Sequence, residues 1–95
     1  MSKASELMNR LLSSEVKGDL LILFHKNPGL IDTIDDVARR IGRTTSIVES
    51  DVKDLVDLGL LKTRRIGKSE VIFLDRVRDR EIQVIVANHI RSLKT

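Results

Sequence analysis

The sequence predicts one small domain that is mainly α-helical and carries a single β-hairpin. Its 95 residues are about the length of one domain. Apolar residues recur at three- and four-residue spacing along most of the chain, which is typical of amphipathic helices. Near the C-terminal third, the extended runs at residues 60–66 and 70–74 flank Gly67-Lys68-Ser69, a pattern typical of a hairpin.

The N-terminal third predicts two helices and a very short strand. Residues 2–12 form a short amphipathic helix whose stripe is Leu7, Met8, Leu11 and Leu12. A second helix begins at a cap, Ser13 or Ser14, and runs to about His25. Its apolar side consists of Val16, Leu20, Leu23 and Phe24. Asn27-Pro28-Gly29 ends this helix, and Leu30 and Ile31 follow as a very short strand or an extended lead-in.

Two further helices are expected on either side of Gly42. Thr33 and Asp36, three positions apart, are typical of an N-cap with an acidic first turn, and the helix should run through Ile41. A longer helix then begins at Thr44 or Thr45 and stops at Gly59, a natural left-handed position. Its apolar stripe consists of Val48, Val52, Leu55 and Val56.

The hairpin and the last helix complete the pattern. If Gly67-Lys68 is the two-residue turn, then Arg65 lies opposite Glu70, and Leu61 lies opposite Leu74. Residues 75–93 predict a final helix. Its broad apolar face comprises Ile82, Ile85, Val86, His89, Ile90 and Leu93.

Residues 34–74 resemble the winged helix-turn-helix family of DNA-binding transcriptional regulators. The resemblance rests on two helices joined by a Gly-containing turn, and on a Leu-x-x-x-Gly-Leu exit at residues 55–60 into a basic hairpin. With the preceding helix it covers residues 14–74, about two thirds of the chain. It implies a single winged-helix domain over residues 1–95, with extra helices at 1–12 and 75–95.

The resemblance also implies where duplex DNA would bind. The second helix of the motif would enter the major groove, and the hairpin, or wing, would contact the backbone. Thr, Ser and Lys can meet base edges or phosphates, and Glu49 can accept from a cytosine amine. The candidate DNA-binding residues are Arg43, Thr44, Thr45, Ser46, Glu49, Ser50, Lys53, Arg64, Arg65 and Lys68.

The charge distribution supports part of this assignment and opposes part of it. Residues 59–74 hold four basic residues and one acidic residue, a net charge of +3, so we expect the wing to supply most of the phosphate affinity. Residues 33–58 hold four basic and six acidic residues, a net charge of −2. On the second helix, Lys53 stands against four acids that repel DNA unless they point away or are paired: Glu49, Asp51, Asp54 and Asp57.

These acids keep a second hypothesis open, in which the chain is a winged-helix docking module whose acidic helix face binds a protein partner. Two of the basic features also have simpler explanations. A basic hairpin can merely protect a sheet edge from aggregation. Arginines that end a helix are stabilised by its dipole, which applies to Arg39, Arg40 and Arg43.

Several other functions are disfavoured. Phe24 and Phe73 are the sole aromatic residues, too few for stacking single-stranded nucleic acid, and the chain has no cysteine. His25 and His89 lie far apart in sequence without an acid at ligand spacing, so we expect no metal site. Without a phosphate-binding loop or nucleophile elbow, we expect no enzyme and no cofactor. The absence of a long apolar run predicts a cytoplasmic protein with no signal peptide and no membrane partner.

The two terminal helices raise the question of assembly. Their apolar stripes can cover each other within a monomer. They can instead form a two-fold dimer, the arrangement in which helix-turn-helix proteins read two half-sites one helical turn apart. We favour the homodimer.

Overall fold

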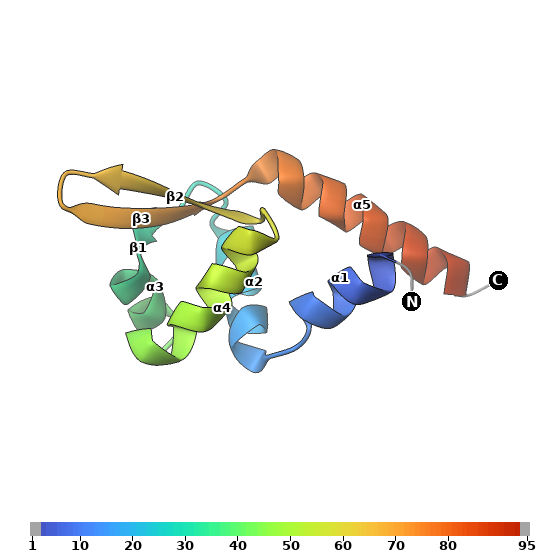
Figure 1. Cartoon of the computed structure of the whole chain (residues 1–95), viewed down its shortest axis with the longest axis horizontal. Coiled ribbons are helices and arrows are strands. Elements are labelled where there is room, and N and C mark those ends of the chain that lie inside the picture. The colour runs from blue at the N-terminus through green and yellow to red at the C-terminus, as the bar shows by residue number, and fades with distance from the viewer. Residues whose placement is uncertain (1–2, 94–95) are drawn as a thin grey trace.

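The computed structural model describes residues 3–93, which form five helices and a three-stranded sheet (Figure 1). In chain order these elements are α1 (Lys3–Leu11), α2 (Glu15–Lys26), β1 (Ile31–Thr33), α3 (Ile34–Arg40), α4 (Thr45–Asp57), β2 (Leu61–Ile66), β3 (Ser69–Leu74) and α5 (Arg76–Leu93). The expected mainly α-helical chain with a small hairpin is confirmed. The start of the first expected helix, at residues 1–2, and the end of the chain, at residues 94–95, lie outside the described residues.

Local capping explains where helices begin. Ser14 caps α2 by accepting a hydrogen bond from the Lys17 amide at 3.0 Å. Thr33 caps α3 in the same way, accepting from the Asp36 amide at 3.2 Å, as the spacing predicted. Thr44 occupies the N-cap of α4 without a side-chain cap bond. The expected helix end at Ile41 is wrong by one residue, because Ile41 is the C-cap of α3.

The sheet is antiparallel with the order β1-β3-β2. The predicted hairpin register is confirmed, with Leu61 opposite Leu74 and Arg65 opposite Glu70. Gly67 has a φ of 60°, a conformation that glycine adopts without strain, and this allows the tight turn. The short strand expected around Ile31 is found as β1, which extends beyond the expected residues to Thr33. It pairs with β3 on the side opposite β2.

The core lies where α2, α3, α4 and the base of the hairpin meet. Its most deeply buried side chains are aliphatic or aromatic: Leu20, Phe24, Val37, Val48, Leu55, Leu60, Leu61 and Ile72. The amide of Asp75 donates to the Leu60 carbonyl at 2.9 Å, which ties the start of α5 to the strand that enters the hairpin. The core therefore fixes α4 and the wing relative to each other.

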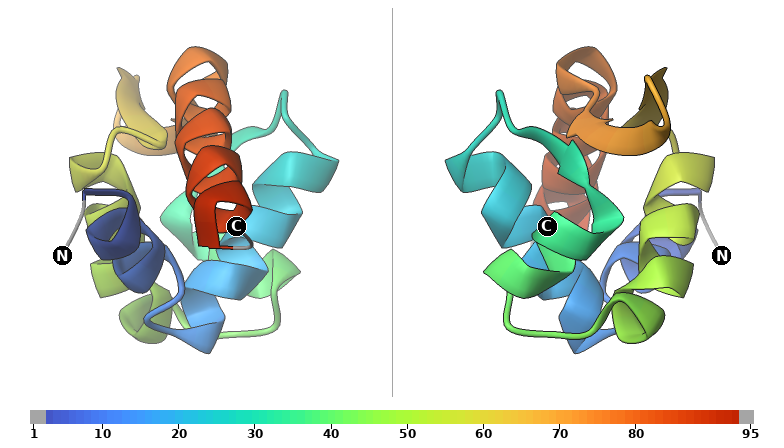
Figure 2. Two further views of the ribbon diagram at one scale, coloured as in Figure 1. Left: turned by 90° about the vertical axis from the view of Figure 1, so that its right-hand side faces the viewer. Right: turned by 90° about the vertical axis from the view of Figure 1, so that its left-hand side faces the viewer.

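The molecule is elongated, with extents of 50 × 24 × 22 Å. The hairpin projects from one end, and α5 runs with α1 toward the other end, where both termini lie (Figures 1 and 2). The predicted broad apolar face of α5 is present, and only part of it is covered. Ile82 is buried and Val86 and His89 are half-buried, whereas three members of that face are exposed: Ile85, Ile90 and Leu93. Leu12, expected in the stripe of the first helix, is also exposed.

Candidate nucleic-acid interface

Helix α4 presents a polar face to solvent because its opposite side is anchored in the core. The anchoring residues are at most 2% exposed: Val48, Val52 and Leu55. About half a turn away, four of the candidate residues are exposed: Ser46, Glu49, Ser50 and Lys53. A helix anchored in this way can offer its outer face to a groove of DNA without bending.

The turn before α4 fixes the angle between α3 and α4. Gly42 has a φ of 70°, and the Arg43 amide donates to the Ala38 carbonyl at 2.9 Å, closing the end of α3. The Arg43 guanidinium binds the Asp19 carboxylate of α2 through Nε at 3.2 Å and Nη2 at 3.0 Å. Arg43 therefore holds the turn against α2. The two preceding arginines make similar but exposed pairs, Arg39 with Asp36 and Arg40 with Asp32.

The N-terminus of α4 is less open than the sequence suggested. Thr44 is exposed, and its hydroxyl lies 3.3 Å from that of Ser46. Thr45 was expected on the exposed face but is half-buried, and its hydroxyl donates to the Asp35 carboxylate of α3. Thr45 thus braces α3 against α4, and Thr44 and Ser46 are left as the accessible hydroxyls at this end.

Two of the four acids on α4 are turned away from the exposed face and paired with α2. The Lys17 ammonium lies 2.7 Å from Asp54 Oδ2 and 3.9 Å from Asp51 Oδ1. The hydrogen bond and charge of Lys17 hold the pKa of Asp54 below its usual range. Glu49 and Asp57 are exposed. The outer surface of α4 is therefore less acidic than its sequence indicates.

The three candidate DNA-binding cations of the wing are exposed: Arg64, Arg65 and Lys68. The Arg64 guanidinium carbon lies 5.8 Å from the centre of the Phe73 ring, within the range of a cation–π interaction. Arg65 faces Glu70 across the hairpin. Forked guanidinium donors on a projecting hairpin suit phosphate oxygens.

The fourth cation of the hairpin has a different role. Lys62 pairs with Asp75 at 3.1 Å, just before α5. Asp75 Oδ1 also accepts from the amides of Val77 and Arg78, at 3.1 Å each. The Arg78 amide, followed by Lys62, holds the pKa of Asp75 below its usual range. Lys62 therefore fixes the base of the wing to α5.

No family model and no curated protein matches the sequence. Among solved structures, an antimony-specific transcriptional repressor, AntR, superimposes with a TM-score of 0.65 at 18% identity, over 98% of this chain and 82% of that one. An ArsR family transcriptional regulator gives 0.66 at 13% identity, over 100% and 98%. A possible transcriptional regulator from Methanosarcina mazei Go1 gives 0.63 at 16% identity, over 98% and 84%. The chain has the winged-helix fold of these proteins.

The two histidines of this winged helix make hydrogen bonds between helices. His25 Nε2 lies 2.8 Å from Asp79 Oδ1, joining α2 to α5, and His89 Nε2 lies 3.1 Å from the Ser5 hydroxyl, joining α5 to α1. Within residues 3–93, no group of three or more His, Asp or Glu side chains could hold a metal ion. No helix in that range is long and apolar enough to cross a membrane.

Sequence reasoning missed two features of the winged helix. Ile47 is 52% exposed on α4, beside the polar face. Ile47 lies off the apolar stripe that contains Val48, so helical periodicity alone could have predicted that it is exposed. Lys17 is only 3% exposed, and no local pattern around Val16 and Leu20 indicates that a lysine is buried there.

Proposed function

We propose that the chain is a DNA-binding transcriptional regulator in which α4 enters the major groove and the wing contacts the phosphate backbone. One observation carries the proposal. Helix α4, whose outer side chains are exposed, and the cationic wing lie toward the same end of the molecule, opposite the C-terminal half of α5 (Figure 1). The superimposed proteins, which are all named as transcriptional regulators or repressors, support it. Because a regulator of this kind acts on DNA, we place the protein in the cytoplasm.

The candidate residues take three roles in this proposal. Ser46, Glu49, Ser50 and Lys53 face the groove, where base edges are read. Arg64, Arg65 and Lys68 neutralise phosphates along the flanking backbone. Arg43 and Thr44 lie beside the N-terminal amides of α4, which attract a phosphate. Thr45 supports this arrangement from behind through Asp35.

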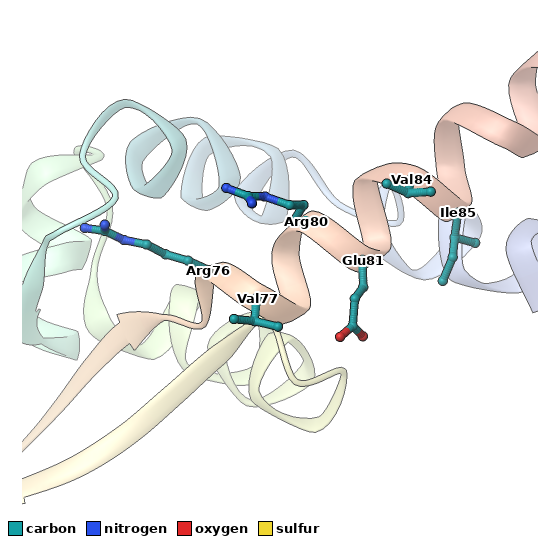
Figure 3. Close-up of a pocket in the computed structure, with 6 residues that line it drawn as sticks. All are labelled: Arg76, Val77, Arg80, Glu81, Val84 and Ile85. Carbon is teal, nitrogen blue, oxygen red and sulfur yellow. The ribbon is translucent and has the colours of Figure 1, made fainter.

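The proposal includes a homodimer formed by the terminal helices. The outer face of α5 has a hollow lined by Arg76, Val77, Arg80, Glu81, Val84 and Ile85 (Figure 3). Val77 and Val84 are more than half exposed on this face, and Ile90 and Leu93 add apolar surface near the C-terminal end of α5. An apolar surface of this kind, rimmed by charges, is typical of a protein interface.

The docking hypothesis is weakened by this geometry. It required an acidic face on α4, but Asp51 and Asp54 are turned toward Lys17. Glu49 and Asp57 alone make a weak acidic patch. Reversing the charge of Glu49 would abolish partner capture under that hypothesis, whereas under ours it changes DNA preference.

The proposal is tested by titrating the protein with random-sequence duplex at two salt concentrations. Binding through phosphate contacts weakens steeply as salt rises, because each contact releases condensed counterions. We expect a dissociation constant of roughly 10⁻⁴ to 10⁻⁶ M near physiological salt and tighter binding at lower salt. Undetectable binding at about 50 mM salt would refute the regulator function.

A further inference from the structure

Lys17 is a buried cation in the first turn of α2, where that helix meets α1 and α4. Its side chain is 4% exposed, which is rare for lysine unless the charge is paired. The ammonium donates to Asp54 Oδ2 at 2.7 Å, to the Ser13 hydroxyl at 2.8 Å and to the Arg10 carbonyl at 3.1 Å. These three bonds use all of its donors.

The partners of this ammonium come from separate elements. Arg10 lies in the last turn of α1, Ser13 lies in the junction before α2, and Asp54 lies in α4. The Ser14 hydroxyl, at the N-cap of α2, makes a second hydrogen bond to α4 by donating to Asp51 Oδ2 at 2.9 Å. The N-terminal turn of α2 is therefore bonded both to the end of α1 and to the middle of α4.

The charges at this junction would affect the affinity of α4 for DNA. Asp51 and Asp54 lie on α4, the helix proposed to enter the groove. Without Lys17, their carboxylates would lose the cation that pairs with them. Asp54 is partly exposed, with 45% of its side chain accessible, so it has a route back toward the outer face. An unpaired carboxylate within about a Debye length of phosphates repels them.

We propose that Lys17 is a positioning residue for DNA binding, which draws Asp51 and Asp54 away from the duplex and holds α4 against the end of α1. Lys17 itself contacts no phosphate. The inference rests on the proposed function, because it assigns a role toward the same surface of α4. It differs from the wing cations in one measurable respect, since its contribution depends on the carboxylates that it pairs.

The test compares duplex affinity in Lys17→Met with that in Lys26→Met, which removes the same charge from the exposed far end of α2. The probe is random-sequence duplex, and the temperature is one at which circular dichroism shows each variant folded. We expect Lys17→Met to bind about tenfold more weakly, within the usual range for coupling between two sites. The loss should be largest at low salt, because salt screens the repulsion between the freed carboxylate and the phosphates. Lys68→Met, which removes a phosphate contact, should lower the slope of affinity against salt by up to about 0.9.

A rescue experiment separates positioning from a purely structural role. In Lys17→Met/Asp54→Asn the unpaired carboxylate is gone, so most of the affinity should return. If Lys17→Met does not fold, Lys17→Gln, which keeps a side-chain donor but no charge, replaces it in both comparisons. Wild-type affinity in the folded Lys17 variant, or no rescue, overturns the inference. Absence of binding by the wild type in the same titration refutes the proposed function instead.

Discussion

Leu55 is the residue on which the placement of α4 most depends. It is fully buried, and its helix packs on α3 in the same core as Val37. Leu55→Ala leaves a cavity at this junction, and we expect it to lower the free energy of unfolding by about 2 to 5 kcal/mol. Chemical denaturation measures the change. Ile47→Ala, on the exposed side of the same helix, should stay within about 0.5 kcal/mol. A similar small change for Leu55 would mean that α4 faces the other way.

Asp75 makes stability depend on acid. Its pKa in the folded protein is held below the ordinary value of 3.8 by the Arg78 amide and Lys62. A carboxyl with a lowered folded pKa stabilises the protein above its unfolded pKa, and this contribution disappears as pH falls through the folded pKa. The stability difference between wild type and Asp75→Asn should therefore be full above pH 3.8 and shrink below it. Urea denaturation across that range measures it, and a difference independent of pH would contradict the assignment.

Residues whose role depends on near neighbours in the chain were predictable. Thr33 caps α3 as its spacing indicated, Ser14 is the one of the two candidate serines that caps α2, and Gly67 forms the hairpin turn. Lys17 and Asp79 were not, because their partners come from other elements. Asp79 lies in the first turn of α5, where acids favour the helix dipole, but it is buried and bonded to His25 of α2. Tertiary packing decides which partners such residues have, and the spacing of residues along one helix does not predict that packing.

At the scale of elements, the wing and α4 should contribute differently to DNA binding. Replacing Arg64, Arg65 and Lys68 with alanine removes three exposed cations, so affinity for every duplex should fall. The salt slope should drop by up to about 0.9 for each phosphate that the wing no longer neutralises. A control variant removes three exposed cations elsewhere, at Lys3, Lys26 and Arg91. An equal fall in affinity in that control would show that only net charge matters.

The complementary change on α4 should alter preference rather than general affinity. Ser46→Ala or Ser50→Ala removes a hydroxyl from the face proposed to meet base edges, and base edges specify sequence whereas phosphates only position the protein. We expect the sequences selected from a random duplex pool to change, while the salt slope stays constant. Unchanged selection in both variants would place base reading elsewhere on the molecule.

The sequence predicted most of the helices and strands, but not which of their side chains are exposed. Hydrophobic spacing and Gly59 and Gly67 located α4 and both long strands to within a residue or two. For α5, helical periodicity indicated which residues share a face, but not which of them would be covered. Ile82 and Val86 pack in or against the core, whereas Ile90 and Leu93 are left exposed.

For the whole molecule, the exposed apolar surface of the terminal helices predicts assembly. Helices α1 and α5 pack together, so part of each stripe is covered within the monomer, yet Val84, Ile85 and Ile90 are still 37% to 54% exposed. A two-fold axis through this end would pair the surface with itself and leave two α4 helices and two wings free to meet successive half-sites.

If this surface forms the dimer, Ile85→Glu or Ile90→Glu should halve the mass in solution, because each two-fold interface would bury the new charge twice. The helical signal should largely survive, since neither side chain belongs to the buried core. Ile22→Glu, at a 55% exposed isoleucine on α2, is the matched control and should leave the mass unchanged. Sedimentation measures all four proteins. A wild type that sediments as a monomer across the micromolar range would exclude the dimer, and each chain would then bind a single half-site.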